Sequence, residues 1–244
     1  MSQQRANTRS LQDNPQSAIR NPQPEDFTRY DQKLEFILRT SARVFAEKGF
    51  HSTSMRDIAR ATKVSLAGLY YYCASKDELL FLIQDNCFGR VLERLEARLK
   101  ETGDPVERFR VVVENHLSFF AANMAEMKVL SHEAESLAGE MYEKVSGKKQ
   151  QYTRTVRRIL SEVQQRRGAG ARKVDLTVAT YALFGMMNWI YNWYDPRGKL
   201  SVADLVETVT RLFLNGFAGG GDLAPVPPRP RADEPLSVWR APRA

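Results

Sequence analysis

The sequence predicts an all-α protein that combines a small N-terminal domain of three helices with a larger C-terminal helical domain. Three observations predict this class. Through the body of the chain, apolar residues recur at the 3.6-residue period of helices, and the strict alternation typical of strands is missing. Residues that favour helix starts precede several of these apolar runs. One uncharged stretch near the C-terminal end has the composition of a helix buried in a core.

Helices are expected to follow one another from residue 31 onward. Gly49 ends the first, since glycine favours the backbone conformation that closes a helix. Ser54 is a preferred N-cap for the second, Ser75 opens the fourth, and proline after Asp104 suits the first position of the fifth. The expected ranges are 31–48, 54–62, 64–72, 75–100, a helix from residue 105, and then 126–146, 147–167, 173–195 and 201–217.

Both ends of the chain differ in composition from the body. Residues 1–30 are rich in Gln, Asn, Ser and Pro, and residues 219–244 are rich first in Gly and then in Pro. Such segments bury too little surface to offset their conformational entropy, so we expect a disordered arm and a flexible tail. The body then divides into a domain over residues 31–85 and a second over residues 86–218.

Overall composition limits the class of protein. The chain has 244 residues, of which 43% are hydrophobic and 27% charged, as in soluble globular proteins. A formal net charge of +7 permits a polyanionic partner. Two cysteines exclude a disulfide scaffold, and no Cys/His pair has zinc-ligand spacing, so we expect no metal and no cofactor. Because no apolar signal peptide is visible in residues 1–30, the expected compartment is the cytoplasm.

The uncharged stretch over residues 176–194 approaches the length of a membrane span. It contains Asn188 and Asn192 together with threonines and tyrosines, which are costly or interfacial in lipid. A helix that is apolar all round typically lies in a protein core. We therefore expect burial in protein and no membrane partner, with a membrane-associated helical protein as the alternative.

Residues 54–73 carry the sharpest functional signal. Two short helices are joined by a brief turn, and their apolar residues are spaced to pack on the first helix: Ile58, Ala59, Val64 and Leu69. This is the helix-turn-helix arrangement, whose second helix enters the major groove of DNA. The alternative is the corner of a small helical bundle with solvated serine and basic side chains.

Side chains on the second short helix suit contacts with duplex DNA. Ser65, Ala67 and Gly68 are small, so the backbone can approach bases and phosphates closely, with helix N–H groups adding positive potential. Successive tyrosines point in different directions on a helix. The hydroxyls of Tyr70 and Tyr71 are therefore candidates for bonds to phosphate oxygens.

Two basic residues flank this helix. Arg56 can reach a base edge or a phosphate. Lys76 lies in the first turn of the next helix, where the helix dipole favours acids, and a phosphate contact would explain a lysine there.

Residues 49–80, GFHSTSMRDIARATKVSLAGLYYYCASKDELL, resemble the DNA-binding domain of the TetR family of transcriptional regulators. The resemblance departs from the family pattern at Cys73, where the family usually has Phe, and at Lys63, which replaces a turn Gly and would need a positive φ. The motifs that carry it read Gly49-Phe50, Thr53-Ser54, Ile58-Ala59, Lys63-Val64-Ser65, Leu69-Tyr70 and Ser75-Lys76-Asp77-Glu78-Leu79. The DNA-facing residues that we expect are Ser54, Arg56, Ser65, Ala67, Gly68, Tyr70, Tyr71 and Lys76.

The resemblance also implies that the helices after residue 85 form a ligand-binding and dimerisation domain. Residues 181–194 concentrate aromatic and Met side chains that suit a core, a dimer seam or an apolar pocket. Asn188 and Asn192 favour the pocket, because buried amides need hydrogen-bond partners that a ligand can supply. His116, by contrast, is more often expected as a core histidine with its own partners. The expected ligand-binding residues are His116, Phe119, Phe120, Met124, Arg157, Met187, Asn188, Trp189, Asn192 and Trp193.

Residues 192–217, NWYDPRGKLSVADLVETVTRLFLNGF, resemble the C-terminal end of the acyl-CoA-responsive branch of this family. An acyl-CoA needs an apolar tunnel and cations for its phosphates, and a run of arginines could supply the cations. Alternatively, these arginines only form a solvated helix face. These arginines are Arg154, Arg157, Arg158, Arg166 and Arg167. The last helix, with Leu205, Val209, Leu212 and Phe213 at helical spacing, is expected to pair with the 173–195 helix across a two-fold axis.

Together these observations predict a homodimeric repressor that binds a pseudo-palindromic operator in double-stranded DNA and is released by a small hydrophobic ligand, an acyl-CoA thioester. The first alternative is a regulator that responds to a different apolar or aromatic ligand. The second is an enzyme, but the sequence contains no Ser/His/Asp or Cys/His order, no phosphate-binding Gly loop and no acidic metal cluster.

Overall fold

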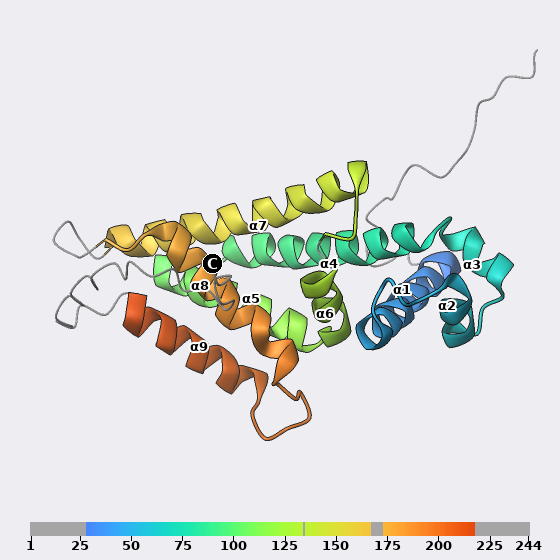
Figure 1. Cartoon of the computed structure of the whole chain (residues 1–244). Coiled ribbons are helices and arrows are strands. Elements are labelled where there is room, and N and C mark those ends of the chain that lie inside the picture. Colours follow the sequence, from blue (N-terminus) through green and yellow to red (C-terminus); the bar gives the residue numbers. More distant parts are fainter. Residues whose placement is uncertain (1–27, 134, 167–172, 218–244) are drawn as a thin grey trace, which may run out of the picture. The chain divides into compact units, whose positions relative to one another are not determined.

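The computed structural model describes residues 28–133, 135–166 and 173–217, and all regular structure in these ranges is helical, as predicted (Figure 1). The predicted tail and residues 1–27 of the predicted arm lie outside the described residues. The elements are α1 (Arg29–Lys48), α2 (Met55–Thr62), α3 (Leu66–Tyr72), α4 (Lys76–Leu99), α5 (Pro105–Ala121), α6 (Met124–His132), α7 (Gly139–Arg166), α8 (Leu176–Asn188), the 3-10 helix η1 (Trp189–Asn192) and α9 (Val202–Phe217).

Helix α1 begins two residues before the predicted start. Thr28 is its N-cap, because the Thr28 hydroxyl accepts from the Asp31 N–H and the Asp31 carboxylate accepts from the Thr28 N–H. Assigning Arg29 and Tyr30 to a disordered arm was therefore wrong. The reciprocal bonds satisfy two backbone donors that a free helix end would leave to water.

Two helix boundaries in the second half of the chain also differ from the prediction. Helix α6 ends at His132, and α7 runs unbroken from Gly139 to Arg166, so the predicted division into 126–146 and 147–167 was wrong. Gly147 lies inside α7, where a glycine costs about 1 kcal/mol but need not end a helix. Glu133, directly after α6, contacts Phe50 and Gln84, which are distant in the sequence and which helical periodicity does not reveal.

The uncharged segment forms a shorter and less buried helix than predicted. Asp175 caps α8 by accepting from the Thr177 and Val178 N–H groups, and the helix gives way to η1 after Asn188. Val178 and Tyr181 are 65% and 63% exposed, so α8 is not buried all round within the chain. Within the described ranges, no helix combines the length and apolar character that crossing a membrane requires.

The contacts group the described residues into two compact units. The first contains α1–α3, the part of α4 up to Arg90, and residues 123–148 with α6 and the start of α7. In this unit α1 packs on α2 and on α6. Its fully buried apolar side chains include Ile37, Ile58, Leu69 and Leu79.

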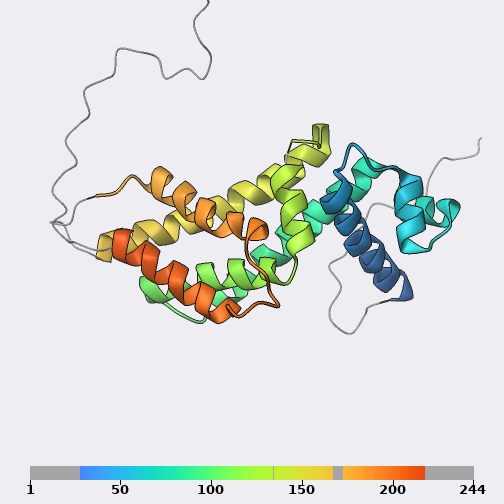
Figure 2. The same cartoon turned by 60° about the horizontal axis from the view of Figure 1, so that its bottom comes forward.

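The second unit contains the rest of α4 from Val91, then α5, the rest of α7 from Lys149, α8 and α9. Helices α5, α8 and α9 contact one another, and they lie side by side in both cartoon views (Figures 1 and 2). Phe109 of α5 is fully buried and stacks on Phe213 of α9, with ring centroids 5.2 Å apart. The division into domains at residue 85 stays a prediction.

Candidate DNA interface and ligand core

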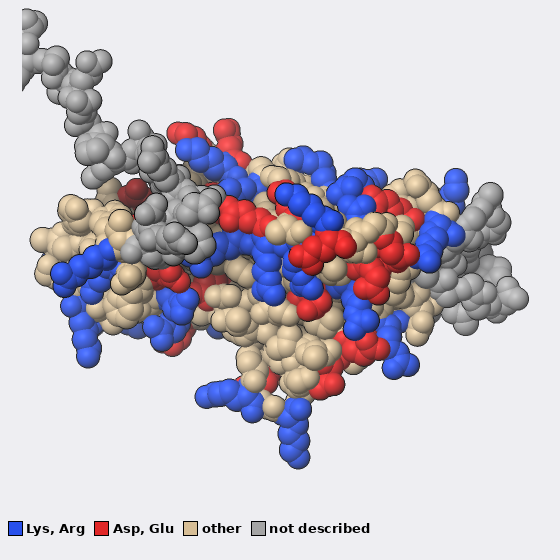
Figure 3. Space-filling model, turned by 180° about the vertical axis from the view of Figure 1, so that it is seen from behind, with Lys and Arg blue, Asp and Glu red and all other residues tan. Residues whose placement is uncertain are grey.

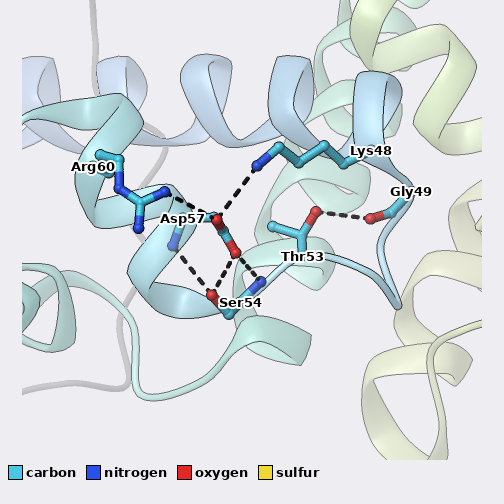
Figure 4. A network of polar contacts seen from close by, with 6 residues as sticks. All are labelled: Lys48, Gly49, Thr53, Ser54, Asp57 and Arg60. Atoms are coloured by element: carbon cyan, nitrogen blue, oxygen red, sulfur yellow. Dashed lines mark hydrogen bonds and ion pairs between the residues drawn. The ribbon is translucent and has the colours of Figure 1, made fainter.

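A charged network fixes the start of α2 (Figure 4). The Ser54 hydroxyl accepts from the Asp57 N–H at 3.2 Å, and the Asp57 carboxylate accepts from the Ser54 N–H at 3.0 Å. Lys48 and Arg60 lie 3.3 Å and 3.5 Å from the same carboxylate. The hydrogen bonds from Ser54, followed by the one from Lys48, hold the pKa of Asp57 well below its usual range. Asp57 therefore stays ionised and anchors the first turn of α2 at neutral pH.

The turn between α2 and α3 has the backbone that the sequence predicted. Lys63 adopts φ 54° and ψ 31°, which is the left-handed conformation usually given to glycine. Such a residue costs about 1–2 kcal/mol when it is not glycine. Its N–H bonds the Arg60 carbonyl at 3.4 Å, and the Val64 N–H bonds the Ala59 carbonyl at 3.2 Å. The prediction of a positive φ at Lys63 is confirmed.

Gly68 leaves little room for a side chain at the start of α3. The Ser65 hydroxyl caps α3 by accepting from the Gly68 N–H at 3.0 Å. A Cβ added at Gly68 would lie 3.0 Å from the Ser65 Oγ and 3.1 Å from a Val64 methyl carbon. A larger residue would therefore require the Ser65 cap and the Val64 side chain to shift by a few tenths of an ångström.

One face of α3 is buried and the other is open. Leu69 is fully buried, whereas Tyr70 and Tyr71 are 48% and 67% exposed. Of the other sequence-predicted DNA contacts, Ser54, Arg56, Ser65 and Ala67 are also exposed, whereas Gly68 and Lys76 are half-buried. Basic and acidic side chains are interspersed on the molecular face drawn in Figure 3, so no single basic patch marks the site there.

The Tyr30 side chain packs against the tyrosines of α3, a contact that sequence reasoning missed. Its ring stacks on Tyr72 with centroids 4.9 Å apart and meets the edge of Tyr71 at 5.9 Å. Tyr30 lies in the first turn of α1, far from α3 in sequence. Only the capping pair Thr28 and Asp31 could have indicated that a helix, and so a fixed side chain, begins there.

Lys76 has a structural partner that the sequence did not reveal. Its Nζ donates to the Phe50 carbonyl oxygen at 2.8 Å and lies 4.3 Å from the centroid of the Phe50 ring. This contact explains a lysine in the first turn of α4 without a phosphate. The predicted phosphate contact stays a prediction.

A buried polar cluster lies in the second unit. The His116 Nδ1 is 3.2 Å from the Tyr152 hydroxyl, and the His116 ring centroid is 4.7 Å from that of Phe120 and 6.2 Å from that of Phe184. Burial lowers the pKa of His116 to about 3, an effect that the nearby Asn188 amide opposes. The imidazole is therefore neutral at pH 7. Its Nε2 has no hydrogen bond of good geometry among the described residues, although the Asn188 side chain lies close enough to the ring to oppose the lowering of its pKa.

Asn115 extends this cluster through a side-chain hydrogen bond with Tyr152. Its Nδ2 donates to the Val91 carbonyl at 3.0 Å, while its Oδ1 has no partner within the described part of the chain. Sequence reasoning missed Asn115, Tyr152 and Phe184. Nothing in the spacing of α5, α7 or α8 distinguished these residues from ordinary core positions.

The structure brings some of the sequence-predicted ligand residues together and separates others. His116 and Phe120 meet in the buried cluster, and the Asn188 side chain interacts with His116 from an exposed position. The expectation that Asn188 and Asn192 are buried amides was therefore wrong, because both residues are exposed. Trp189 and Trp193 are instead 61% and 54% exposed. Of the remaining residues, Met187 is buried, Phe119 and Met124 are half-buried, and Arg157 and Asn192 are exposed.

Both cysteines are poor candidates for chemistry. Burial raises the pKa of Cys73 to about 11 and that of Cys87 to about 12. Both thiols therefore stay protonated at neutral pH, and neither is an activated nucleophile.

Comparison with known proteins decides the family. Residues 37–83 match the model described as bacterial regulatory proteins of the tetR family, and residues 102–217 match the tetracyclin repressor-like C-terminal domain. A TetR-family transcriptional regulator from Bordetella parapertussis is 30% identical, with a TM-score of 0.69 over 76% of this chain and 95% of that one. The chain belongs to the TetR family. It is thus a DNA-binding transcriptional repressor whose helix-turn-helix is α2 and α3.

Two further proteins are similar to this chain over 74% of its length. The fatty acid metabolism regulator protein of Bacillus subtilis is 25% identical over 184 residues, which cover 74% of this chain and 93% of that protein. The crystal structure of AibR in complex with isovaleryl coenzyme A and operator DNA is 29% identical, with a TM-score of 0.66 over 74% of this chain and 97% of that one.

Proposed function

We propose that this TetR-family protein is a homodimer that binds a pseudo-palindromic operator and releases it when an acyl-CoA thioester occupies the core of its second unit. The buried cluster around His116 carries the ligand part of the proposal. The similarity to AibR, whose crystal structure contains isovaleryl coenzyme A and operator DNA, supports both parts.

The open face of α3 supplies the proposed DNA contacts. Ser65, Ala67 and Gly68 bring the backbone close to the groove, while Tyr70 and Tyr71 bond phosphates with their hydroxyls. From outside α3, Ser54, Arg56 and Lys76 complete the contact surface, with Arg56 as the base-reading residue. Two such surfaces in a dimer would enter successive major grooves, about 34 Å apart.

The protonation state of His116 favours an uncharged acyl group. In the neutral tautomer whose Nδ1 accepts from the Tyr152 hydroxyl, Nε2 carries the hydrogen and can donate it to a thioester carbonyl oxygen. A free carboxylate in the same place would be a buried charge without a cation, which is expensive. The cluster therefore suits the thioester better than the free acid.

The coenzyme end of the ligand needs cations. Among the described residues, Arg154 and Arg157 of α7 form no ion pair within 4.0 Å, although the charge of Arg157 acts on the Asp175 carboxylate, whereas Arg158 pairs with Glu162 and Arg166 pairs with Asp104. Arg154 and Arg157 are both exposed. We therefore assign the phosphates to this pair; Arg167, the other arginine considered, lies outside the described residues.

The partner in the dimer is assigned to the exposed apolar face of α8 and α9. Val178, Tyr181, Trp189 and Trp193 lie more than half exposed on or just after α8, and Leu212 is 63% exposed on α9. Such a set on one soluble chain marks an interaction surface, and a second copy is the partner that symmetry makes self-complementary. Leu205, Val209 and Phe213, by contrast, are buried within the protomer.

A thermal-shift series tests the ligand directly. A ligand that binds only the folded state raises the melting temperature as its concentration exceeds its Kd. We expect acyl-CoA thioesters to raise it and the matched free acids to do so less. His116→Phe, which fills the site without a donor, should abolish the shift. A shift of equal size with free acid and thioester would contradict this reading, and a response only to other apolar or aromatic compounds would favour the alternative ligand class.

A further inference from the structure

Phe50, in the turn between α1 and α2, has both backbone groups bonded to charged side chains from other elements. Its N–H donates to the Glu133 carboxylate at 3.2 Å, and its carbonyl accepts from the Lys76 Nζ at 2.8 Å. Glu133 lies 83 residues further along the chain, directly after α6. We infer that Glu133 and Lys76 clamp this turn and set the operator-binding orientation of α2 and α3, with Glu133 as a positioning residue; the inference rests on the proposed operator-binding homodimer.

Glu133 is itself held in place. Its second carboxylate oxygen accepts from the Ser136 hydroxyl at 2.7 Å, and its carbonyl accepts from the Gln84 Nε2 at 2.9 Å. Gln84 belongs to α4 and is fully buried. The end of α6 is therefore fastened to α4 on one side and to the turn at Phe50 on the other.

Phe50 cannot shift alone, because it is fixed to the start of α2. Its ring is buried and meets the Phe45 ring edge-on at 5.2 Å. The Thr53 N–H bonds the Phe50 carbonyl at 3.2 Å, and the Thr53 hydroxyl bonds the Gly49 carbonyl at 2.8 Å. Thr53 precedes Ser54, the N-cap of α2, so a shift of Phe50 would also move the start of α2.

The chemistry of the clamp makes it sensitive to α6. A bond from a backbone N–H to a carboxylate is charge-assisted, about twice as strong as a neutral one, and weakens steeply once distance or angle departs from the optimum. A movement of the end of α6 by about 1 Å would break it. Whatever shifts α6 therefore changes the angle at which α2 and α3 are presented.

The test compares two DNA duplexes. Wild-type protein first selects a duplex from a random library, and a second duplex then keeps one half-site and scrambles the other. Glu133→Leu should weaken binding to the full site by about tenfold and should leave binding to the half-site unchanged. The reason is that the two α2–α3 units of the dimer would no longer match the distance between the two half-sites. Glu133→Gln, which keeps an acceptor for the Phe50 N–H, should recover most of the loss. Glu135→Leu, at an exposed neighbour, is the matched control.

Amide exchange supplies a second readout that needs no DNA. In Glu133→Leu the Phe50 amide should exchange with solvent about tenfold faster than in the wild type, while the Ile58 amide inside α2 should not change. Gln84→Met, which frees the Glu133 carbonyl, should give the same pattern in weaker form if Glu133→Leu does not fold. If the wild type selects no duplex, the operator proposal fails, while the exchange rates still test the clamp.

Two results would overturn the inference. In the first, Glu133→Leu binds the full site as tightly as wild type and keeps a protected Phe50 amide. In the second, full-site and half-site binding fall together with the melting temperature, so that Glu133 only stabilises the fold.

Discussion

Tyr30 stacks on Tyr72 with ring centroids 4.9 Å apart and ring planes inclined by 27°. This contact joins the first turn of α1 to the last turn of α3. Tyr71, the most exposed of these tyrosines, meets the edges of both rings. The proposed DNA contact of Tyr71 therefore depends on a residue outside the helix-turn-helix.

Removal of Tyr30 should weaken DNA binding indirectly. Tyr30→Ala takes away the ring against which Tyr71 and Tyr72 rest, and we expect a loss of about 0.5–1.5 kcal/mol in binding, the size of an aromatic pair. Tyr30→Phe keeps the ring and should bind as the wild type does. Fluorescence anisotropy with a labelled duplex measures both, and equal loss in the two variants would point to a direct role of the Tyr30 hydroxyl.

Tyr71→Ala should weaken binding to every duplex by a similar factor, because a phosphate contact carries no sequence information. The side chain is 67% exposed, so the melting temperature should change little. Tyr142→Ala, at a 47% exposed tyrosine on α7, is the control and should leave binding intact. Unchanged gel-shift retention of the Tyr71 variant would remove this face of α3 from the interface.

Arg56→Ala should relax sequence preference at one operator position. A bidentate contact to a base is worth about 1–3 kcal/mol of discrimination. Selection from a random library followed by sequencing gives the preference at each position. A profile identical to that of the wild type would leave Arg56 with no base-reading role.

These predictions rest on a region that the sequence describes well, because its signals are local. The N-cap Ser54, the acid three residues later and the left-handed turn at Lys63 each act within a few residues, so the short helices could be placed from the sequence. The end of α6 could not, because Glu133 is held by Gln84 and Phe50, which are distant in the sequence. The exposure of Trp189 could not be predicted either, because periodicity shows that a helix face is apolar but not whether another element covers it.

Stability should depend on pH through His116. Its pKa falls from 6.5 in the unfolded chain to about 3 in the fold, so below pH 6.5 the unfolded state binds a proton that the folded state excludes. The free energy of unfolding should then fall by about 1.4 kcal/mol for each pH unit from 6.5 downward, until the folded group itself titrates.

Denaturant titrations between pH 7 and pH 4 measure this dependence. His116→Gln, which cannot ionise, should be less sensitive to acid than the wild type, whereas His51→Gln, at an exposed histidine, should keep the wild-type slope. Parallel curves for the wild type and His116→Gln would show that the imidazole is already charged or solvated in the fold.

An acidic residue on the exposed face of α9 should separate the protomers. Leu212→Asp places a charge where a second copy is proposed to pack, and burying it without a partner is costly. We expect the mass measured by light scattering to fall to that of one chain, and operator affinity to fall with it. Leu200→Asp, at a 40% exposed leucine before α9, is the comparison. A dimer that survives Leu212→Asp would move the interface elsewhere.

The central claim is tested most directly by following a fluorescent operator duplex, selected by the wild-type protein, as acyl-CoA is added. The account predicts saturable binding of one dimer per duplex, release by isovaleryl-CoA or a longer acyl-CoA, and little release by free coenzyme A or the matching free acids. Failure to bind any selected duplex would contradict the proposed operator binding, and binding that no thioester alters would contradict the proposed ligand.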